Sequence, residues 1–365
     1  MTVAFQSFGR SALGDGFIES PLKARGYITA PAWLAGSNDA TKILISSIAA
    51  GTSGWSKSSL SAVRPRYPWA TYGRAFGFNY SSGFSDLYQS SDGLTWTKQI
   101  TARMAFPQMF KSASSRLFLG YGGALAADGE NIAHSDNNFT TPVTTALTAN
   151  ALRSTPFKQF AGGRIIFGLN VPSPTLYKST IYYTDDDGDN WSSYTIDDTF
   201  AGWIQNMFYV SATDTMYLVC RHTNTGFATN YLYSSADGTS WTQVKALTSS
   251  DCSWNRTVSF YNRESYVLSS GRVIVSMDLQ NALNLNMHYS DNNGQKWYLA
   301  ASTGVDVPYG PLRKKDGILY ARTTIDTRNK IIQSSDGVNW SELVNLYPID
   351  TTNQFGLAIS GQEDN

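Results

Sequence analysis

Residues 334–340 read SSDGVNW and residues 90–96 read SSDGLTW, so five of seven letters agree across 244 positions. The same phrase recurs with changes at 184–191 (TDDDGDNW), 235–241 (SADGTSW) and 290–297 (SDNNGQKW), and in weaker form at 135–139 (SDNNF) and in the run that ends at Trp55. The closing aromatic residues of these seven copies are separated by 41 to 56 residues. A fixed period of this length indicates a repeat architecture.

Strand-like runs flank each copy of the phrase. In the unit around residue 186, TIYYTD precedes the phrase and WSSYTI follows it, so the Asp/Gly turn predicts a β-hairpin. Two further runs, such as PFKQF and RIIFGL, precede the hairpin. Four strands per unit are typical of a propeller blade. The sequence therefore predicts an all-β propeller of seven four-stranded blades, with six blades as the alternative.

The two ends of the repeat region complement each other. Near the N-terminus, GYITAPAW, KILISSI and WSKSSLSAV supply three strands, and QFGLAIS (354–360) supplies one more near the C-terminus. Pairing of these N- and C-terminal strands would close the ring and leave no exposed sheet edge. We expect residues 26–365 to form this single propeller domain. Residues 1–25 are expected to be an N-terminal arm that contacts another subunit, or an extended segment laid on the propeller.

The composition excludes several classes of partner. The formal net charge is zero and only 15% of residues are charged, so no nucleic-acid partner is predicted. No run of 18 apolar residues occurs, so no membrane insertion is expected, and the first residues do not resemble a signal peptide. Two cysteines, Cys220 and Cys252, cannot form a disulfide framework, and we expect a reduced pair rather than one bridge.

The phrase resembles the Asp box, or bacterial neuraminidase repeat, with the pattern S/T-x-D-x-G-x-x-W. TDDDGDNW matches it fully, SDNNGQKW has Asn292 in place of the Asp, and three copies are one residue shorter between Asp and Gly. The resemblance covers roughly residues 40–345. It implies the sialidase-like propeller fold, in which the boxes form the turns between third and fourth strands, opposite the usual binding face.

We predict that the box residues are structural rather than catalytic. The acidic or amide side chain can accept backbone N–H groups of its own turn, Gly supplies a positive φ, and the Trp ring fills the seam between blades. These structural residues are Asp92, Trp96, Asp186, Trp191, Asp237, Trp241, Asn292, Trp297, Asp336 and Trp340. Asp185–Asp189 (DDDGD) also resembles part of a calcium loop, but a distal Glu is missing. No cofactor or metal is predicted, with calcium at this loop as the alternative.

The loops on the other face of the predicted ring repeatedly carry Arg, Asp and large aromatic residues. Aromatic faces cover the C–H side of a sugar ring, and Arg binds a carboxylate with two parallel hydrogen bonds. The candidate ligand-binding residues are Arg103, Arg153, Asp198, Trp203, Asp251, Trp254, Arg256, Asp306, Tyr309 and Arg313. The alternative is that these charges pair with one another and the aromatic rings fill the blade tops.

Catalytic residues are not predicted. Sialidases of the resembling fold use three Arg, a Tyr–Glu pair, an Asp and an Arg-Ile-Pro motif. Here VRPRYP (63–68) matches that motif only poorly. Glu occurs at only five positions, and no Tyr–Glu pair can be placed. We therefore expect a non-catalytic chain. The alternative is a glycoside hydrolase that uses Asp carboxylates on cell-surface polysaccharide.

The charged fraction is low and the boxes vary in length. In both respects the chain resembles a bacteriophage virion protein of the tail or its appendages. This resemblance implies a structural docking role, host-surface glycan binding, or both. The expected partners are other virion or assembly subunits and host-surface glycans, and the expected location is the virion, with the cytoplasm as alternative. A cellular assembly factor that binds a protein partner with the loop face is a third interpretation.

Overall fold

The computed structural model describes 20 segments of the chain. They are residues 33–36, 42–46, 55–59, 65–71, 74–81, 84–92, 95–100, 104–123, 130–147, 153–154, 157–171, 178–196, 202–222, 230–248, 251, 265–278, 285–300, 312–323, 330–346 and 357–359.

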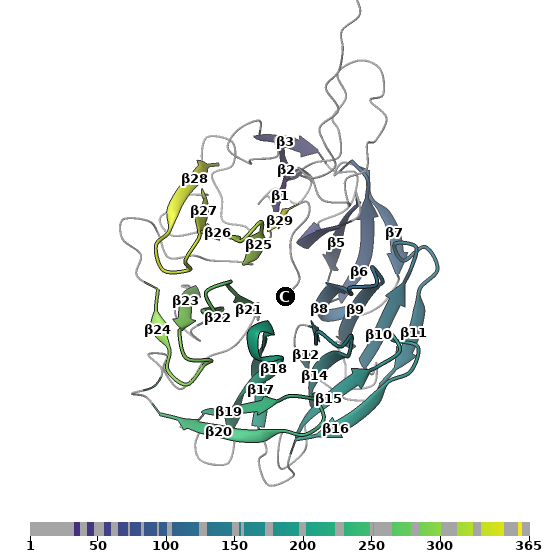
Figure 1. The fold of residues 1–365 in the computed structure, drawn as a ribbon. Helices are drawn as coiled ribbons and strands as arrows, with labels where there is room; N and C mark the ends of the chain where they lie inside the picture. Colours follow the sequence, from purple (N-terminus) through teal and green to yellow (C-terminus); the bar gives the residue numbers. More distant parts are fainter. Residues whose placement is uncertain are drawn as a thin grey trace, which may run out of the picture.

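In these segments the strands form seven antiparallel sheets, which we number as blades 1 to 7 in chain order (Figure 1). Blade 1 contains β29 (Leu357–Ile359), β1 (Trp33–Gly36), β2 (Lys42–Ser46) and β3 (Trp55–Ser59); blade 2 contains β4 (Pro65–Thr71), β5 (Arg74–Ser81), β6 (Phe84–Ser90) and β7 (Thr97–Ile100); blade 3 contains β8 (Met104–Lys111), β9 (Leu117–Gly123), β10 (Glu130–Ser135) and β11 (Val143–Ala146). Blade 4 contains β12 (Arg153–Ser154), β13 (Lys158–Gln159), β14 (Ile165–Val171), β15 (Lys178–Thr184) and β16 (Ser192–Thr195); blade 5 contains β17 (Gly202–Val210), β18 (Thr215–His222), β19 (Asn230–Ser235) and β20 (Thr242–Leu247). Blade 6 contains β21 (Ser265–Val267), β22 (Val273–Asp278), β23 (Leu285–Ser290) and β24 (Tyr298–Leu299); blade 7 contains β25 (Arg313–Lys315), β26 (Ile318–Thr323), β27 (Lys330–Ser334) and β28 (Ser341–Asn345).

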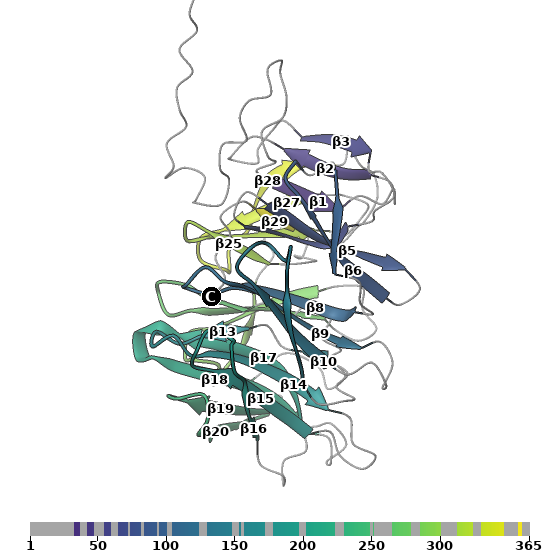
Figure 2. The same cartoon turned by 90° about the vertical axis from the view of Figure 1, so that its right-hand side faces the viewer.

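The prediction of an all-β propeller is confirmed. Six sheets have four strands, and blade 4 has five because the short strands β12 and β13 both pair with β14. The sheets are arranged around a common centre, with β8, β12, β21 and β25 nearest the middle (Figure 1). Figure 2 shows the ring from the side, with β2 and β3 on the opposite side from β16 and β20. A single short 3-10 turn, η2 (Ser211–Thr213), interrupts the strands among the described residues.

Blade 1 is built from both ends of the repeat region. Strand β29 pairs antiparallel with β1, so that Ala358 lies opposite Leu34. Strands β2 and β3 complete this sheet in the order β29-β1-β2-β3. The C-terminal strand therefore takes the innermost place in a sheet whose other strands come from the N-terminal part. Residues 1–25 lie outside the described residues, and the predicted arm stays a prediction.

The two box lengths produce two kinds of hairpin. In blades 2, 5 and 7 the box is one residue shorter, and the pairing of the third with the fourth strand shifts register by one residue. In blade 5, for example, Leu232 pairs with Lys245 and Tyr233 with Gln243, which leaves Val244 as the extra residue. The longer boxes of blades 4 and 6 are followed by pairing without a shift. The residue missing from the turn thus reappears as a β-bulge in the outermost strand.

The hydrophobic core is divided among the seams between adjacent blades. The cluster around Phe208 of blade 5 also contains Val273 and Trp297 of blade 6. The cluster around Phe118 of blade 3 also contains Phe157 and Phe167 of blade 4. Among the described side chains, blades 2 to 7 are thus held by apolar packing against one another, as expected for sheets that pack face to face.

The described residues bear on two predictions made from composition, the absence of a membrane-spanning helix and the state of the cysteines. No helix among them is long and apolar enough to cross a membrane. Cys220 is buried, and burial raises the pKa of its thiol to about 12. Its possible partner Cys252 lies outside the described residues, so their pairing is not tested.

Candidate functional site

The Asp boxes form the turns between the third and fourth strands. In blade 4, the Thr184 hydroxyl donates to Asp186 Oδ1 at 2.7 Å and accepts the Gly188 N–H at 2.9 Å. The same carboxylate oxygen accepts the Asn190 N–H at 2.9 Å, and its partner oxygen accepts the Asn190 side-chain amide at 2.7 Å. Both oxygens of Asp186 are therefore engaged within the seven residues from Thr184 to Asn190.

The boxes of blades 2, 5, 6 and 7 repeat this bonding. Asp237 accepts the backbone N–H groups of Thr239 and Ser240, both at 2.7 Å. Asp336 accepts those of Val338 at 2.9 Å and Asn339 at 2.8 Å. The same acceptor role is held by Asp92 toward Thr95 at 2.7 Å and by Asn292 toward Lys296 at 2.9 Å. Since a neutral Asn292 serves in blade 6, the turn requires an acceptor oxygen rather than a charge.

This equivalence predicts a pH effect. The hydrogen bond from the Thr184 hydroxyl, followed by that from the Asn190 N–H, lowers the pKa of Asp186 to about 2. Its folded-state pKa lies below its unfolded value, so this stabilisation is present above about pH 4 and is lost as the pH falls toward 2. Asp186→Asn keeps the acceptor oxygen but not the charge, so it should lower stability at pH 7 by about as much as the wild type loses between pH 4 and pH 2, and urea unfolding of the variant should be less acid-sensitive in this range. A variant that stays as acid-sensitive as the wild type would show that Asp186 does not supply this stabilisation.

The box glycines that the structure describes combine a positive φ with a close approach to the preceding blade. Gly188, Gly294 and Gly337 have φ of 94°, 80° and 73°. A Cβ added at Gly188 would lie 3.0 Å from Phe118 Cζ, and one at Gly294 would lie 2.9 Å from Phe208 Cζ. In these three boxes glycine is favoured both by the backbone conformation and by the nearness of the preceding blade.

The weak box of blade 3 corrects one prediction. Phe139 was expected to close this box as the other copies are closed by Trp. Instead it occupies the glycine position, with φ of 60° and its N–H donated to Ser135 Oγ at 2.8 Å. Its fully buried ring meets Phe76 of blade 2 edge-on at 6.0 Å. The ring therefore fills the seam between blades 2 and 3 from a different position in the turn.

Each box Trp of the longer boxes packs against the preceding blade. Trp191 of blade 4 meets Phe118 of blade 3 edge-on, with ring centroids 6.2 Å apart. Trp297 of blade 6 meets Phe208 of blade 5 in the same way at 5.9 Å. In the shorter box of blade 7, Trp340 also donates its indole N–H to the Gly337 carbonyl at 3.3 Å.

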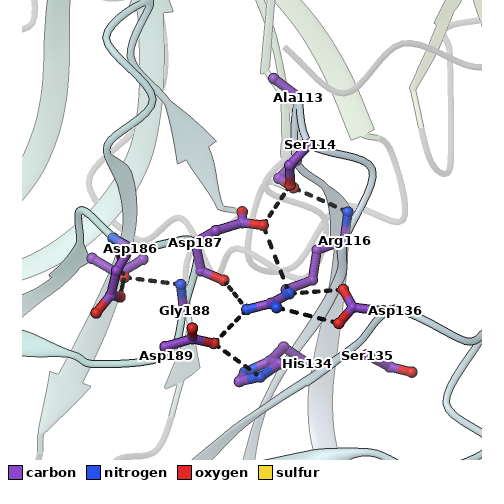
Figure 3. Close-up of polar contacts among 12 residues, drawn as sticks. Ala113, Ser114, Arg116, His134, Ser135, Asp136, Asp186, Asp187, Gly188 and Asp189 are labelled. Atoms are coloured by element: carbon purple, nitrogen blue, oxygen red, sulfur yellow. Dashed lines mark hydrogen bonds and ion pairs between the residues drawn. The ribbon is translucent and has the colours of Figure 1, made fainter.

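A set of arginine contacts, which we call the arginine clasp, joins neighbouring boxes. Between blades 3 and 4, Arg116 binds both carboxylate oxygens of Asp136 at 2.8 and 3.2 Å (Figure 3). It also donates to the Asp187 carbonyl at 2.8 Å and to the Asp189 carboxylate at 2.6 Å. This hydrogen bonding lowers the pKa of Asp136. Burial lowers the pKa of the adjacent His134, whose Nε2 lies 3.9 Å from Asp189.

The arginine clasp recurs at two more seams. Arg164 binds both oxygens of Asp185 at 2.6 and 2.8 Å and donates to the Asp237 carbonyl of blade 5. Arg272 binds both oxygens of Asp291 at 2.5 and 3.0 Å and donates to the backbone carbonyl of Asp336, in blade 7, at 2.9 Å. In each case the arginine directly precedes the strand next to the innermost one (β9, β14 or β22) and reaches the box turn of the next blade.

The proposed calcium loop is occupied by these contacts. Asp185 binds Arg164, and Asp186 accepts the bonds of its own turn. Asp187 accepts the Ser114 hydroxyl, and Asp189 binds Arg116. In the part of the chain that the structure describes, no three His, Cys, Asp or Glu residues come together as a metal site. The carboxylates of this loop therefore bind cationic and hydroxyl donors of the chain itself.

The inner strands of blades 4 to 7 form a second polar region. Lys158 of β13 reaches past blade 5 and donates to the Ser265 carbonyl of β21 at 3.0 Å. Ser265 in turn donates its hydroxyl to the Met207 carbonyl of β17 at 2.6 Å. On β25, Arg313, Lys314 and Lys315 are all buried, and burial lowers the pKa of Lys315. Polar and basic groups thus lie where the blades approach the middle of the ring.

A comparison with protein families assigns this architecture. Residues 32–347 match the model of the BNR repeat-like domain. The chain belongs to the BNR repeat-like domain family. The resemblance of its boxes to the bacterial neuraminidase repeat is thereby confirmed, and the sialidase-like propeller superfamily is supported.

Several solved structures have a fold similar to that of this BNR repeat-like propeller. A protein from Lactobacillus plantarum is similar over 89% of this chain and 98% of its own, with 12% identity and a TM-score of 0.57. An ulvan lyase, bound to a glucuronate–rhamnose 3-sulfate unit, is similar over 76% of this chain and 83% of its own, with 11% identity and a TM-score of 0.52. The α-L-arabinofuranosidase Arb93A from Fusarium graminearum is similar over 66% of this chain and 80% of its own, with 12% identity and a TM-score of 0.47. No curated protein matches the sequence significantly.

Most residues predicted to bind a ligand lie outside the described residues of the BNR repeat-like propeller. These are Arg103, Asp198, Trp254, Arg256, Asp306 and Tyr309. Arg153 lies in β12 and Trp203 in β17, and only their backbone is described. The predicted ring therefore stays a prediction at these eight positions.

The two remaining candidates hold contacts within the chain. Asp251 binds Lys245 Nζ at 2.6 Å and accepts the Thr248 N–H at 3.0 Å. Its backbone carbonyl accepts the Trp297 N–H at 2.7 Å, so it lies against the box turn of blade 6. Arg313 is buried and donates to the Leu312 carbonyl at 2.9 Å. The structure does not bring these two residues together.

The clasp arginines were not predicted from the sequence, because they lie on the face of the Asp boxes and not in the loops that carry the candidate ligand-binding residues. A signal is nevertheless present in the sequence. Arg116, Arg164 and Arg272 each open a run of branched or aromatic residues, RLFLG, RIIFG and RVIVS. Their units are the ones in which the box reads SD or TD rather than SS or SA. An Arg at the start of the apolar run, together with an Asp as the second residue of the box in the same unit, predicts the arginine clasp.

Proposed function

We propose that this BNR repeat-like propeller is a non-catalytic, glycan-binding subunit of a larger assembly, which binds polysaccharide with the loops opposite the Asp boxes. The observation that carries this proposal is the engagement of the box carboxylates. In the described part of the chain, the acidic side chains of the boxes in blades 2, 4, 5 and 7 accept bonds of their own turns. The most repeated residues therefore support the scaffold, and recognition is left to the variable loops.

The chemistry of those loops fits a sugar ligand. Arg153 and Arg256 would donate paired hydrogen bonds to a carboxylate or to adjacent hydroxyls. Trp203 and Trp254 would stack on the C–H face of a pyranose. Because Asp251 and Arg313 already hold contacts within the chain, the proposal does not depend on them. The fold is shared with an ulvan lyase, which supports a glycan-related role.

The assembly that we propose is a bacteriophage virion, with this propeller in the tail or an appendage. The support is compositional, because the charged fraction of 15% is well below the roughly 25% of an average soluble protein. Immuno-electron microscopy of purified particles from the source culture should label the tail region. Particles that lack the protein would overturn this part of the proposal.

A glycan array tests binding directly. The wild-type chain should bind at least one bacterial surface polysaccharide, and Arg153→Ala and Arg256→Ala should each lower affinity by roughly 10- to 100-fold, since each removes a charged hydrogen-bonding group. Lys98→Ala is the matched control: its ammonium is exposed and binds Asp86 on blade 2, so affinity should not change.

Two results would overturn the proposal. The absence of any array signal for the folded wild-type chain would exclude glycan binding. Release of reducing sugar from the polysaccharide that it binds would replace the binding module by the glycoside hydrolase interpretation.

A further inference from the structure

Two buried amide side chains on β17 have polar atoms that make no hydrogen bond. Gln205 is 3% exposed and Asn206 is 1% exposed. In the described structure, Gln205 Oε1 and both polar side-chain atoms of Asn206 make no hydrogen bond. An unsatisfied buried donor or acceptor costs about 1–3 kcal/mol, and such groups are rare in native proteins. A site that binds a polar ligand is one reason for a chain to keep them.

The position of these amides in the fold points in the same direction. The pairing of β17 with β18 shifts register between Ile204 and Asn206, so Gln205 is the extra residue of a β-bulge. Bulges redirect side chains and are over-represented next to active sites. β17 is the first strand of blade 5, the position that lies nearest the middle of the ring in neighbouring blades (Figure 1).

A cationic donor lies close to the same segment. The Met207 carbonyl, one residue beyond Asn206, accepts the Ser265 hydroxyl, and the Ser265 carbonyl accepts Lys158 Nζ. The inner strands of blades 4, 5 and 6 are therefore linked at the level of Met207. Adjacent residues in a strand are only about 3.3 Å apart along its axis, so the amides lie just beside this link.

We infer that Gln205 and Asn206 form a hydrogen-bonding subsite for a sugar with adjacent hydroxyl groups, at the inner end of the glycan site. This inference rests on the proposed function and adds residues that the sequence did not indicate. The Asn206 amide offers one donor and one acceptor side by side, which matches two neighbouring hydroxyls, and Gln205 offers a further acceptor. Since the polar atoms of Asn206 are held by no hydrogen bond, its amide can turn toward the sugar without breaking one.

The test uses the array-positive oligosaccharide with the full chain. Asn206→Leu should lower its affinity by about 10- to 100-fold, because two hydrogen bonds are lost. The unliganded variant should be as stable as the wild type or more stable, because an unsatisfied buried amide is replaced by an apolar group of similar size. Gln89→Leu is the matched control: Gln89 Oε1 also lacks a partner, but it lies on β6, the third strand of blade 2. Its replacement should not change affinity.

A measurement on the wild type makes the test independent of variant folding. The side-chain amide NMR signals of Gln205 and Asn206 should shift when the oligosaccharide is titrated, and that of Gln89 should not. Unchanged signals, or wild-type affinity in a folded Asn206→Leu variant, would overturn the inference while the arginine variants still test the proposed function. If the wild type binds no glycan, both the proposed function and this inference fail.

Discussion

Replacing Trp340 by alanine should lower the free energy of unfolding by about 3–5 kcal/mol, the usual cost of removing a large buried aromatic side chain. Trp340 is 5% exposed and packs in a cluster with Ile274 of blade 6 and Leu319 of blade 7. Its indole N–H is donated to the Gly337 carbonyl. The substitution therefore opens a cavity at the seam and removes one bond of the box. Urea unfolding followed by Trp fluorescence and circular dichroism measures the change.

Val143→Ala is the control for this prediction. Val143 lies on β11, an outermost strand like the one that follows Trp340, and its side chain is 55% exposed. A surface change of this kind should alter stability by no more than about 0.5 kcal/mol. If Trp340→Ala cost as little as Val143→Ala, Trp340 would not hold the seam between blades 6 and 7.

The second large effect is expected at Gly337. Its φ is +73°, and an added Cβ would overlap Ile274 Cδ1 and lie 2.6 Å from Ile274 Cγ1. Gly337→Ala should cost about 1–2 kcal/mol for the left-handed backbone and a further 1–3 kcal/mol for overpacking, or about 2–5 kcal/mol together. The same urea unfolding experiment measures this loss.

Gly317 separates the two contributions. It lies in the same blade with φ of +76°, but a Cβ there would meet nothing within 4 Å. Gly317→Ala should therefore cost only the backbone part, about 1–2 kcal/mol. Adding Ile274→Ala should lessen the damage of Gly337→Ala, because the overlapping atoms are gone. Equal losses at the two glycines would show that the approach of the box to blade 6 is not close.

The repeat made the fold predictable from the sequence. The spacing of the boxes indicated both the propeller and the place of each hairpin. This was possible because the Asp and Gly of a box are required by the geometry of its own turn, and its Trp packs against one neighbouring blade. The completion of blade 1 by residues 357–359 was predictable because a lone C-terminal strand had no other partner. Phe139 was misplaced because an aromatic residue can fill the seam from the glycine position, which spacing alone does not distinguish.

The polar contacts between blades were harder to predict. Arg116 meets Asp189 of the next blade, a partner 73 residues away whose position depends on how two blades twist together. The unsatisfied amide atoms of Gln205 and Asn206 lie at a register shift in β17, and no turn residue in the sequence indicates that shift. Local patterns indicated the scaffold, whereas contacts that depend on blade geometry required the structure.

The central claim is that the boxes maintain the scaffold and the opposite loops recognise the ligand. Its most direct test compares the affinity of Trp340→Ala and Arg256→Ala for the array-positive polysaccharide, at a temperature where circular dichroism shows both to be folded. Trp340→Ala should be much less stable yet bind like the wild type, and Arg256→Ala should be as stable as the wild type yet bind roughly 10- to 100-fold more weakly. Loss of binding in folded Trp340→Ala, with binding retained in Arg256→Ala, would contradict the account.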